Sequence, residues 1–266
     1  MFDSNNALFQ RVMDIESSLA GHKIRVSQKI AVFDLDDTLI DGDIGDAVFA
    51  RLKLDETHRL LTLQQERLAL EWREYRILIE TGKKQEAYRR VVTCMAGMPL
   101  KTLVECTRSL IRTTPGHIKI EGETVPVPAV KPDMVELLKL LKKLKYRIMV
   151  ISASNHFSVR IAAGELLKLP RSRTFGIRPK ISFLRPDPAN RRMAVLTGTL
   201  HEPVPWSRGK AELYTRLTRG IPPLISGGDS HSDLFLLNLT HPLGLAIWAG
   251  RGGGQPRNLF RLYPGP

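Results

Sequence analysis

Cysteine is scarce in this chain, whose 266 residues include only Cys94 and Cys106. Neither residue belongs to a CxxC pair or to a cluster with nearby histidines, so a disulfide framework and a cysteine–histidine zinc centre are excluded. The apolar, helix-like surroundings of both residues predict buried free thiols. Free thiols are typical of a cytoplasmic protein.

Long hydrophobic runs are also missing. No stretch approaches the roughly 18 apolar residues that a membrane-spanning helix needs. The first residues, MFDSNNALFQRVMDIESS, carry acids early and hold no apolar block, so they lack the pattern of a secretory signal. We therefore expect a cytoplasmic protein without a membrane partner. Its 42% of hydrophobic and 25% of charged residues are typical of globular domains.

Acidic residues are the minority among the charged ones, with 27 Asp and Glu against 40 Lys and Arg, a net charge of +13. Such a surplus attracts polyanions and speeds the encounter with anionic substrates. The basic residues are spread along the chain, however, as in KKQEAYRR, KLLKKLKYR and KLPRSRTFGIRPK, with few aromatic residues between them. This pattern favours a generally solvated basic surface over a dedicated nucleic-acid platform, which stays open as the less favoured interpretation.

What the chain does contain is an alternation of short apolar runs and amphipathic stretches. Buried strands are predicted at KIAVFD (29–34), RIMVIS (147–152), PPLISGG (222–228) and LGLAIWA (243–249), with helices between the later ones. Residues 43–113 follow a helical pattern, and 117–128 (HIKIEGETVPVP) predict a hairpin or an extended connector. Alternating strands and helices imply an α/β fold, a doubly wound, Rossmann-like parallel sheet with an inserted helical lid.

Polar residues follow three of the predicted strands. Asp34 ends the first strand, Ser152 ends RIMVIS, and Asp229 follows PPLIS. The carboxyl ends of parallel strands share one edge of the sheet, where ligands gather. Asp36 comes two residues after Asp34, and two carboxylates this close need a cation. Mg²⁺ prefers such hard oxygen ligands, so we expect a magnesium site completed by a carboxylate of GGDSHSD.

Phosphate chemistry accounts for the remaining groups. A carboxylate that attacks a phosphomonoester is an anion approaching an anion, so the site needs positive charge. Mg²⁺ and Lys210, at the start of a predicted helix, can supply it. Ser152 can donate a hydrogen bond to a phosphoryl oxygen. Asp36 can protonate the leaving alcohol and later activate water against an aspartyl-phosphate.

The segments FDLDDT, ISAS, RGK and GGDSHSD stand in the order of the four motifs of haloacid-dehalogenase-superfamily phosphatases. Over roughly residues 29–41 and 129–248 the chain resembles the phosphoserine-phosphatase-like branch of that superfamily. The resemblance implies an α/β core from residues 29–42 and 129–266, and a mainly helical cap from 43–128. Residues 1–28 would be an N-terminal helical extension. Its amphipathic stretch, NALFQRVMDIESSL, is open to packing on the core or on a partner.

The resemblance also assigns roles. It implies the catalytic residues Asp34, Asp36, Ser152 and Lys210. Of these, Asp34 would be the nucleophile, Asp36 the general acid and base, and the other two would hold the phosphoryl group. Mg²⁺ would be bound by Asp34, by Asp229 and by the backbone carbonyl of Asp36, while Asp233 would support the lysine or the metal's waters.

The positions at which the sequence departs from that branch would affect which substrate is bound. Ala153 and Ser154 follow the motif serine where the branch usually has glycines. Asp43 stands where the branch often has an acid that faces the substrate's amino group, although an acidic helix N-terminus explains it equally well. Arg89 and Arg90 are both candidates for gripping a substrate carboxylate, and neither is a clean match. An aminoalcohol phosphate therefore fits about as well as an amino-acid phosphate.

These patterns together predict a Mg²⁺-dependent hydrolase, a phosphoric monoester phosphatase. Its substrate would be a small phosphorylated metabolite of the amino-acid or aminoalcohol type, hydrolysed through an aspartyl-phosphate. Two alternatives stay open: a basic nucleic-acid- or partner-binding protein on the same fold, and a phosphatase of phosphorylated polymer ends. The sequence leaves the oligomeric state unknown.

Overall fold

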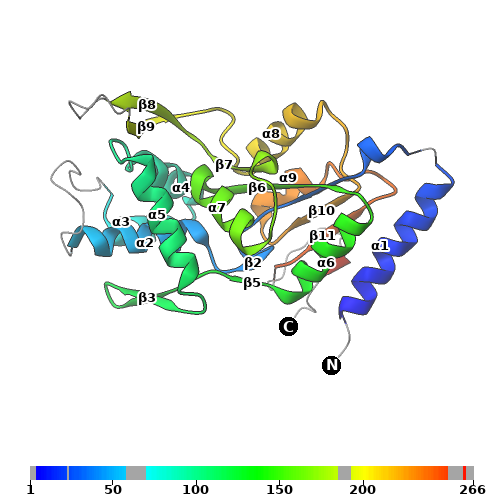
Figure 1. Cartoon of the computed structure of the whole chain (residues 1–266), viewed down its shortest axis with the longest axis horizontal. Coiled ribbons are helices and arrows are strands. Elements are labelled where there is room, and N and C mark those ends of the chain that lie inside the picture. The colour runs from blue at the N-terminus through cyan, green and yellow to red at the C-terminus, as the bar shows by residue number, and fades with distance from the viewer. Residues whose placement is uncertain (1–3, 23, 58–69, 185–192, 251–259, 262–266) are drawn as a thin grey trace.

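A parallel sheet forms the centre of the molecule (Figure 1). The computed structural model describes residues 4–22, 24–57, 70–184, 193–250 and 260–261. The sheet has six parallel strands in the order β12-β11-β10-β1-β6-β7. Their bounds are β1 Ile30–Phe33, β6 Arg147–Asn155, β7 Thr174–Ile177, β10 Ile225–Gly228, β11 Leu245–Trp248 and β12 Phe260–Arg261. The predicted α/β fold with a Rossmann-like parallel sheet is confirmed.

Helices cover both faces of this sheet. They are α1 Ser4–Ala20, α6 Pro132–Lys143, α7 His156–Leu166, α8 Arg208–Thr218 and α9 Leu234–Leu237. Successive residues of a strand point to opposite faces. Ala31 and Phe33 of β1 belong to the core cluster that includes α1, α6 and α7, whereas Ile30 and Val32 pack with α8 and α9. The run IAVF is apolar throughout because neither side of β1 meets water.

The chain changes direction across the sheet at β1. From β1 it continues to β6 and β7 on one side, and later to β10, β11 and β12 on the other. In open α/β sheets, ligands bind outside the carboxyl ends of the strands at such a switch point. The neighbours here are β1 and β10, with Phe33 opposite Gly227. Residues that follow these two strands therefore lie together at one edge.

A mainly helical insertion follows β1. It contains α2 Ile44–Thr57, α3 Trp72–Glu80, α4 Lys84–Thr93 and α5 Leu100–Arg112, and then the hairpin of β3 His117–Ile120 and β4 Glu123–Pro126. We call these elements the cap. Phe49, Trp72 and Tyr75 form its aromatic centre, with ring centroids 5.4 to 5.9 Å apart. The short strands before and after the cap, β2 Ile40–Asp41 and β5 Ala129–Val130, pair antiparallel. The chain therefore enters and leaves the cap at one place.

A second hairpin lies outside the central sheet. It is formed by β8 Pro179–Leu184 and β9 Met193–Leu200, which pair antiparallel. The backbone N–H of Gly97 donates to the carbonyl of Leu196, and that of Leu196 donates to the carbonyl of Met98, both at 2.9 Å. These bonds tie β9 to the turn between α4 and α5. The hairpin thus joins the cap to the segment between β7 and α8.

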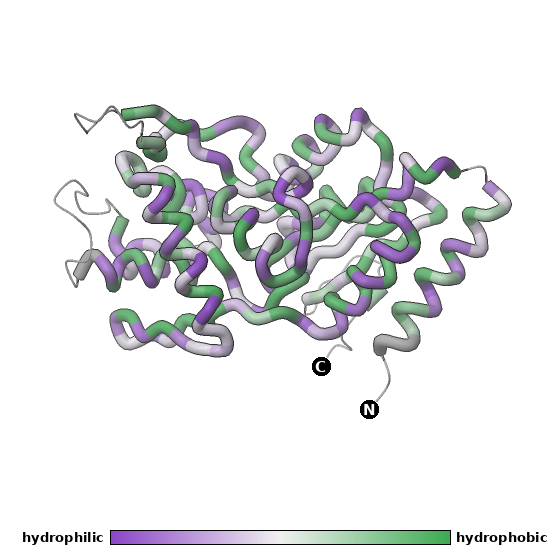
Figure 2. Tube along the Cα trace, in the orientation of Figure 1, coloured by the Kyte–Doolittle hydropathy of each residue, from purple (hydrophilic) through white to green (hydrophobic). Residues whose placement is uncertain are grey.

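The N-terminal helix α1 packs on the core. Leu8 and Val12 are fully buried. The carboxylate of Glu16 pairs with Lys29 and accepts a hydrogen bond of 2.8 Å from the Tyr146 hydroxyl. Hydrophobic and hydrophilic residues alternate along this helix (Figure 2). Of the two interpretations that the sequence left open, packing on the core is therefore the observed one.

The sequence analysis also made predictions about the two cysteines and about membrane-spanning helices. Cys94 and Cys106 are not joined in a disulfide. Both cysteines are half-buried rather than buried: they pack against the core cluster and keep part of their surface exposed. In the ranges that the structure describes, we find no helix with the length and apolar character to cross a membrane.

Candidate active site

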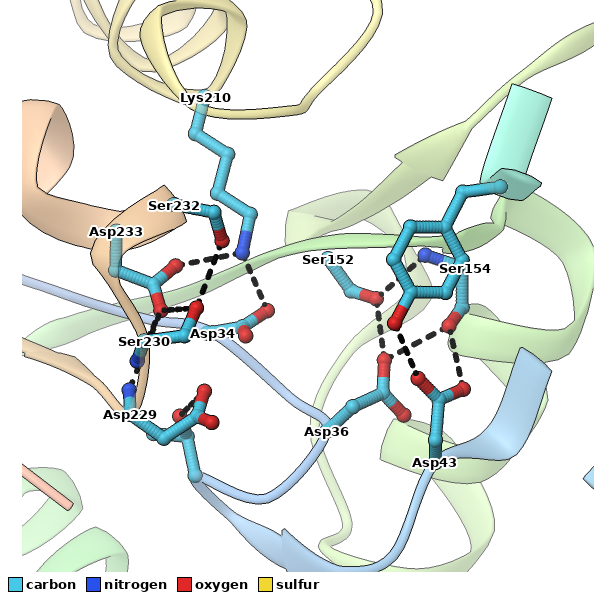
Figure 3. Close-up of polar contacts among 12 residues, drawn as sticks. Asp34, Asp36, Asp43, Ser152, Ser154, Lys210, Asp229, Ser230, Ser232 and Asp233 are labelled. Carbon is cyan, nitrogen blue, oxygen red and sulfur yellow. Dashed lines mark hydrogen bonds and ion pairs between the residues drawn. The ribbon is translucent and has the colours of Figure 1, made fainter. Parts of the chain in front are cut away.

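A buried lysine joins two aspartates at the carboxyl edge of the sheet. Asp34 follows β1 directly and is 5% exposed. Lys210 lies in the first turn of α8, and its Nζ is 2.9 Å from Oδ1 of Asp34 and 2.6 Å from Oδ1 of Asp233. Figure 3 shows the lysine side chain reaching from α8 toward both carboxylates. The structure thus brings together three residues that the sequence singled out.

Asp229 follows β10 at the same edge. The backbone N–H of Asp34 donates to the carbonyl of Gly227 at 2.9 Å, which ties the ends of β1 and β10 together. The Thr38 hydroxyl donates to Oδ1 of Asp229 at 3.3 Å. One carboxylate oxygen each from Asp34, Asp229 and Asp233 lie within 4.8 Å of one another. The predicted acidic group is therefore assembled from both strands at the switch point.

Two glycines allow the backbone to approach this group closely. A Cβ on Gly228 would lie 2.4 Å from the Cβ of Asp233, and a Cβ on Gly209 would lie 1.9 Å from the carbonyl oxygen of Val204. Both distances are far below van der Waals contact. Any side chain at these positions would displace Asp233 or the start of α8, which carries Lys210.

Burial governs how these groups ionise. Burial raises the pKa of Asp34 well above its ordinary value, against the lowering effect of Lys210. Burial, followed by the charge of Asp233, raises the pKa of Asp229 to about 7. Burial by itself would lower the pKa of Lys210, but Asp233 and Asp34 outweigh it and hold that pKa above its ordinary value. One ammonium thus faces three carboxylates, and a further cation would relieve their repulsion.

The acidic group fits a hard divalent cation. Its donors are closely spaced, largely buried carboxylate oxygens, the kind of ligand that Mg²⁺ prefers. The oxygens of Asp233 are already engaged, because Oδ1 contacts Lys210 and Oδ2 accepts hydrogen bonds from the backbone N–H groups of Asp229 and Ser230. Asp34 and Asp229 are therefore the carboxylates with most capacity for an ion.

Asp36 belongs to a second, adjoining group of side chains. Its carboxylate accepts hydrogen bonds from the hydroxyls of Ser152 and Ser154, at 2.7 and 2.8 Å, and from the backbone N–H of Ile44 at 2.8 Å. Burial and the charge of Asp43 raise the pKa of Asp36 to about 8, although these hydrogen bonds lower it. A carboxyl group of this kind holds a proton at neutral pH and can donate it.

The cap reaches this second group through a tyrosine. Oδ1 of Asp43 accepts hydrogen bonds from the backbone N–H groups of Gly45 and Asp46, at 2.7 and 3.0 Å, so that Asp43 caps the start of α2. The Tyr88 hydroxyl, on α4, donates to Oδ2 of Asp43 at 3.2 Å. The rings of Tyr88 and Trp206 pack at a centroid distance of 5.4 Å. Of the two interpretations that the sequence left for Asp43, helix capping is therefore observed, and contact with the substrate stays a prediction.

Arg89 and Arg90 lie elsewhere on the cap. Arg89 pairs with Glu202 at 3.4 Å and Arg90 with Glu74 at 2.6 Å. Both arginines line a cavity of about 650 Å³ together with Trp206 and other residues of α4. The structure does not bring either guanidinium to Asp43, because successive helix residues point about 100° apart and Tyr88 occupies the direction toward the site.

Comparison with known proteins identifies the family. Residues 31–238 match the haloacid dehalogenase-like hydrolases. The chain belongs to this family. No curated protein matches the sequence of this hydrolase.

Solved structures with the same fold share little sequence with the hydrolase. A phospho-aspartyl intermediate analogue of phosphoserine phosphatase is 18% identical, with 83% of this chain and 85% of that chain covered and a TM-score of 0.50. A functionally unknown protein from Anaerococcus prevotii DSM 20548 is 15% identical, with 92% and 87% covered and a TM-score of 0.59. A protein of unknown function from Bordetella pertussis Tohama I is 17% identical, with 83% and 89% covered and a TM-score of 0.56. These likenesses concern the fold.

The predicted membership of this hydrolase family and its phosphoserine-phosphatase-like fold are confirmed. Ser154, which the sequence analysis treated only as a departure, contacts Asp36 beside Ser152. The alternation of side chains along a strand could have revealed it, since residues two apart on β6 point the same way. No local signal marks Tyr88 or Trp206, which meet only because the cap lies against the segment before α8.

Proposed function

We propose that this hydrolase is a Mg²⁺-dependent phosphomonoesterase that forms an aspartyl-phosphate on Asp34. The proposal rests on the buried contact of Lys210 with Asp34 and Asp233, next to Asp229. Attack of a carboxylate on a phosphate ester requires positive charge beside both anions. Here an ammonium touches the attacking group itself. Membership of the hydrolase family and the fold likeness to a phosphoserine phosphatase structure support a phosphatase.

The reaction proceeds in two displacements. In the first, an oxygen of Asp34 attacks phosphorus, the bond from phosphorus to the alcohol oxygen breaks, and Asp36 gives its proton to that oxygen. In the second, Asp36 takes a proton from water, the water oxygen attacks phosphorus, and the bond to Asp34 breaks. Inorganic phosphate leaves and both carboxyl groups are restored. Hydrogen bonds from Ser154 and the N–H of Ile44 orient Asp36 for both proton transfers.

Asp34 and Asp229 would hold the Mg²⁺, together with the backbone carbonyl of Asp36 that the family resemblance implies. When bound, the ion neutralises charge on the phosphoryl oxygens and on Asp34. Lys210 adds positive charge beside Asp34, and Asp233 fixes the lysine there. The Ser152 hydroxyl, next to Asp36, donates to a phosphoryl oxygen when substrate is present.

The surroundings of Asp43 favour an aminoalcohol phosphate over an amino-acid phosphate. Asp43 is half-buried and offers carboxylate oxygens between Ser154 and Tyr88, which suits an ammonium group of the substrate. A substrate carboxylate would need a cation nearby. Arg89 and Arg90, the candidates for that role, are paired with glutamates instead. We therefore expect faster phosphate release from phosphoethanolamine than from phosphoserine.

Hydrolysis of an aryl phosphate by matched asparagine variants tests the assignment. Asp34→Asn and Asp36→Asn should each lower kcat by at least about 100-fold, since nucleophilic and proton-transfer roles contribute factors of that size. Asp37→Asn is the matched control, because Asp37 is an exposed neighbour whose Oδ1 accepts the Gly42 N–H, a bond that asparagine can keep. This control should turn over at the wild-type rate. Undiminished turnover by Asp34→Asn would refute the proposal.

Metal dependence is a separate test. Removal of divalent ions with a chelator should abolish turnover, and added Mg²⁺ should restore it. Excess Ca²⁺ should inhibit, because Ca²⁺ takes about 6–8 oxygen ligands where Mg²⁺ requires an octahedral set. Asp229→Ala should raise the Mg²⁺ concentration needed for half-maximal activity. Full activity in excess chelator would be incompatible with this mechanism.

A further inference from the structure

Basic side chains gather on one side of the molecule, around the edge strand β7. Five of them are Lys or Arg, and the sixth, His201, is neutral at neutral pH because its pKa is lowered. We call this group the β7 basic patch. It consists of Arg160 on α7, Arg171 and Arg173 in the 3-10 turn before β7, Arg178 directly after β7, Lys180 on β8, and His201 directly after β9. Arg160 is half-buried, and the other members are exposed.

Hydrogen bonds to backbone carbonyls connect the elements that carry the β7 basic patch. Nε of Arg160 donates to the carbonyl of Arg171 at 2.8 Å, which joins α7 to the turn before β7. The backbone N–H of His201 donates to the carbonyl of Arg178 at 2.8 Å, which joins the end of β9 to the end of β7. Arg178 links the two halves electrostatically. After burial, its charge is the largest cause that lowers the pKa of Arg160, and likewise that of His201.

Among the residues that the structure describes, the members of the patch have no acidic partner. Residues 167–184 contain five Lys or Arg and no Asp or Glu. Across the described ranges, no member of the patch forms an ion pair, whereas Arg108, close by on α5, pairs with Glu165, the acid of α7, at 2.8 Å. Neighbouring cations without counter-charges repel each other, so a polyanion would gain affinity by relieving that repulsion.

We propose that the β7 basic patch binds nucleic acid through its phosphate backbone. Four of the members are arginines, whose planar guanidinium matches phosphate oxygens with paired N–H donors. The cations are spread over α7, the two ends of β7 and the base of the β8–β9 hairpin, which suits a ligand with repeated charges better than one small anion.

The β7 basic patch reaches the edge of the sheet that carries Asp34. β7 is parallel to β1, so Arg178 lies at the same edge of the sheet as Asp34. A bound strand would run along β7 from Arg171 and Arg173, at the opposite edge, to Arg178 at the edge that carries Asp34. The inference rests on the charges of the patch alone and stands whether or not the protein hydrolyses phosphate esters.

Fluorescence anisotropy with a labelled single-stranded RNA and a labelled DNA duplex provides the test. Binding should weaken with salt between about 50 and 200 mM, with a log–log slope near −4 for about five phosphate contacts. The variant Arg178→Glu/Lys180→Glu should bind at least about tenfold more weakly and show a slope about two units shallower. The matched control is Arg73→Glu/Lys119→Glu, the same charge change at exposed cap residues of α3 and β3. It should bind like wild type, and thermal unfolding should confirm that both variants are folded.

Three results would overturn the proposal. The first is no binding of either nucleic acid at low salt. The second is equal loss of affinity in the patch variant and the cap control, which would mean that diffuse net charge is responsible. The third is stronger binding to anionic lipid vesicles than to RNA or DNA, which would make the patch a membrane-docking surface. If the glutamate variant fails to fold, Arg178→Ala/Lys180→Ala should still flatten the salt slope by about two units.

Discussion

The buried contact between Lys210 and Asp233 can be examined by a double-mutant cycle. Lys210 is 1% exposed and Asp233 is fully buried, and their charged atoms lie 2.6 Å apart. Replacing Lys210 with methionine keeps most of the side-chain volume and removes the charge. Asp34 and Asp233 then remain as buried carboxylates without their cation.

The expected cost of Lys210→Met follows from that geometry. Removing one partner of a buried ion pair typically costs about 3–5 kcal/mol, because the remaining charge is left uncompensated. Asp233→Asn should cost less, since Asp34 still pairs with the lysine and an asparagine oxygen can accept the N–H groups of Asp229 and Ser230. In the double variant only Asp34 lacks a partner. The combined loss should therefore be smaller than the sum of the two single losses by at least about 1 kcal/mol.

Urea denaturation of the four proteins at neutral pH measures these free energies of unfolding. Turnover of an aryl phosphate should be lost in both single variants and in the double variant. Activity should therefore show no recovery in the double variant, unlike the free energy of unfolding. Additivity of the two single losses within about 0.5 kcal/mol would refute the reasoning. A cost below about 1 kcal/mol for Lys210→Met would do the same, because such a value is typical of solvated surface pairs.

Three further predictions concern positions outside this contact. Asp43→Ala should destabilise the protein by about 0.5–2 kcal/mol through loss of the α2 cap, whereas Asp43→Ser, which can cap the helix, should stay near wild-type stability in thermal unfolding. Gly209→Ala should cost about 1–3 kcal/mol because its Cβ would meet Val204. By contrast, Gly164→Ala on α7 would make only an ordinary van der Waals contact of 3.7 Å with the carbonyl oxygen of Leu169, and should be neutral or stabilising by up to about 1 kcal/mol. Burial, with the charges of Arg160 and Arg178, lowers the pKa of His156 from 6.5 in the unfolded chain to about 3. The unfolded state therefore binds the extra proton, and stability falls as pH drops below 6.5. Between pH 7 and pH 5, wild type should lose about 2 kcal/mol more than His156→Gln, and equal losses would contradict this.

The sequence by itself determined the parts of this protein that depend on local patterns. The run IAVF is apolar because β1 is covered on both faces, and the acids that follow it must then lie at the carboxyl edge of the sheet. The same logic brings Asp229 beside Asp34, since parallel strands end at a common edge. Strand ends and motif order were therefore sufficient to predict the acidic group and Lys210.

Only the tertiary structure decided which cap residue faces that edge. Tyr88, Arg89 and Arg90 are consecutive, but each step along a helix turns the side chain by about 100°. Tyr88 meets Asp43, whereas the arginines pair with glutamates at the surface. The rotation of α4 is set by its packing on the end of β9 and on Trp206, contacts between segments more than 100 residues apart.

The β7 basic patch was likewise not predictable from the sequence. Its members come from α7, the residues on either side of β7, β8 and the residue after β9, and along the sequence they look like part of an evenly spread positive charge. They become neighbours because α7 packs beside the edge strand and β9 returns antiparallel to β8. Strand periodicity predicts which residues share a face, but long-range pairing determines which faces meet, and no local pattern contains that information.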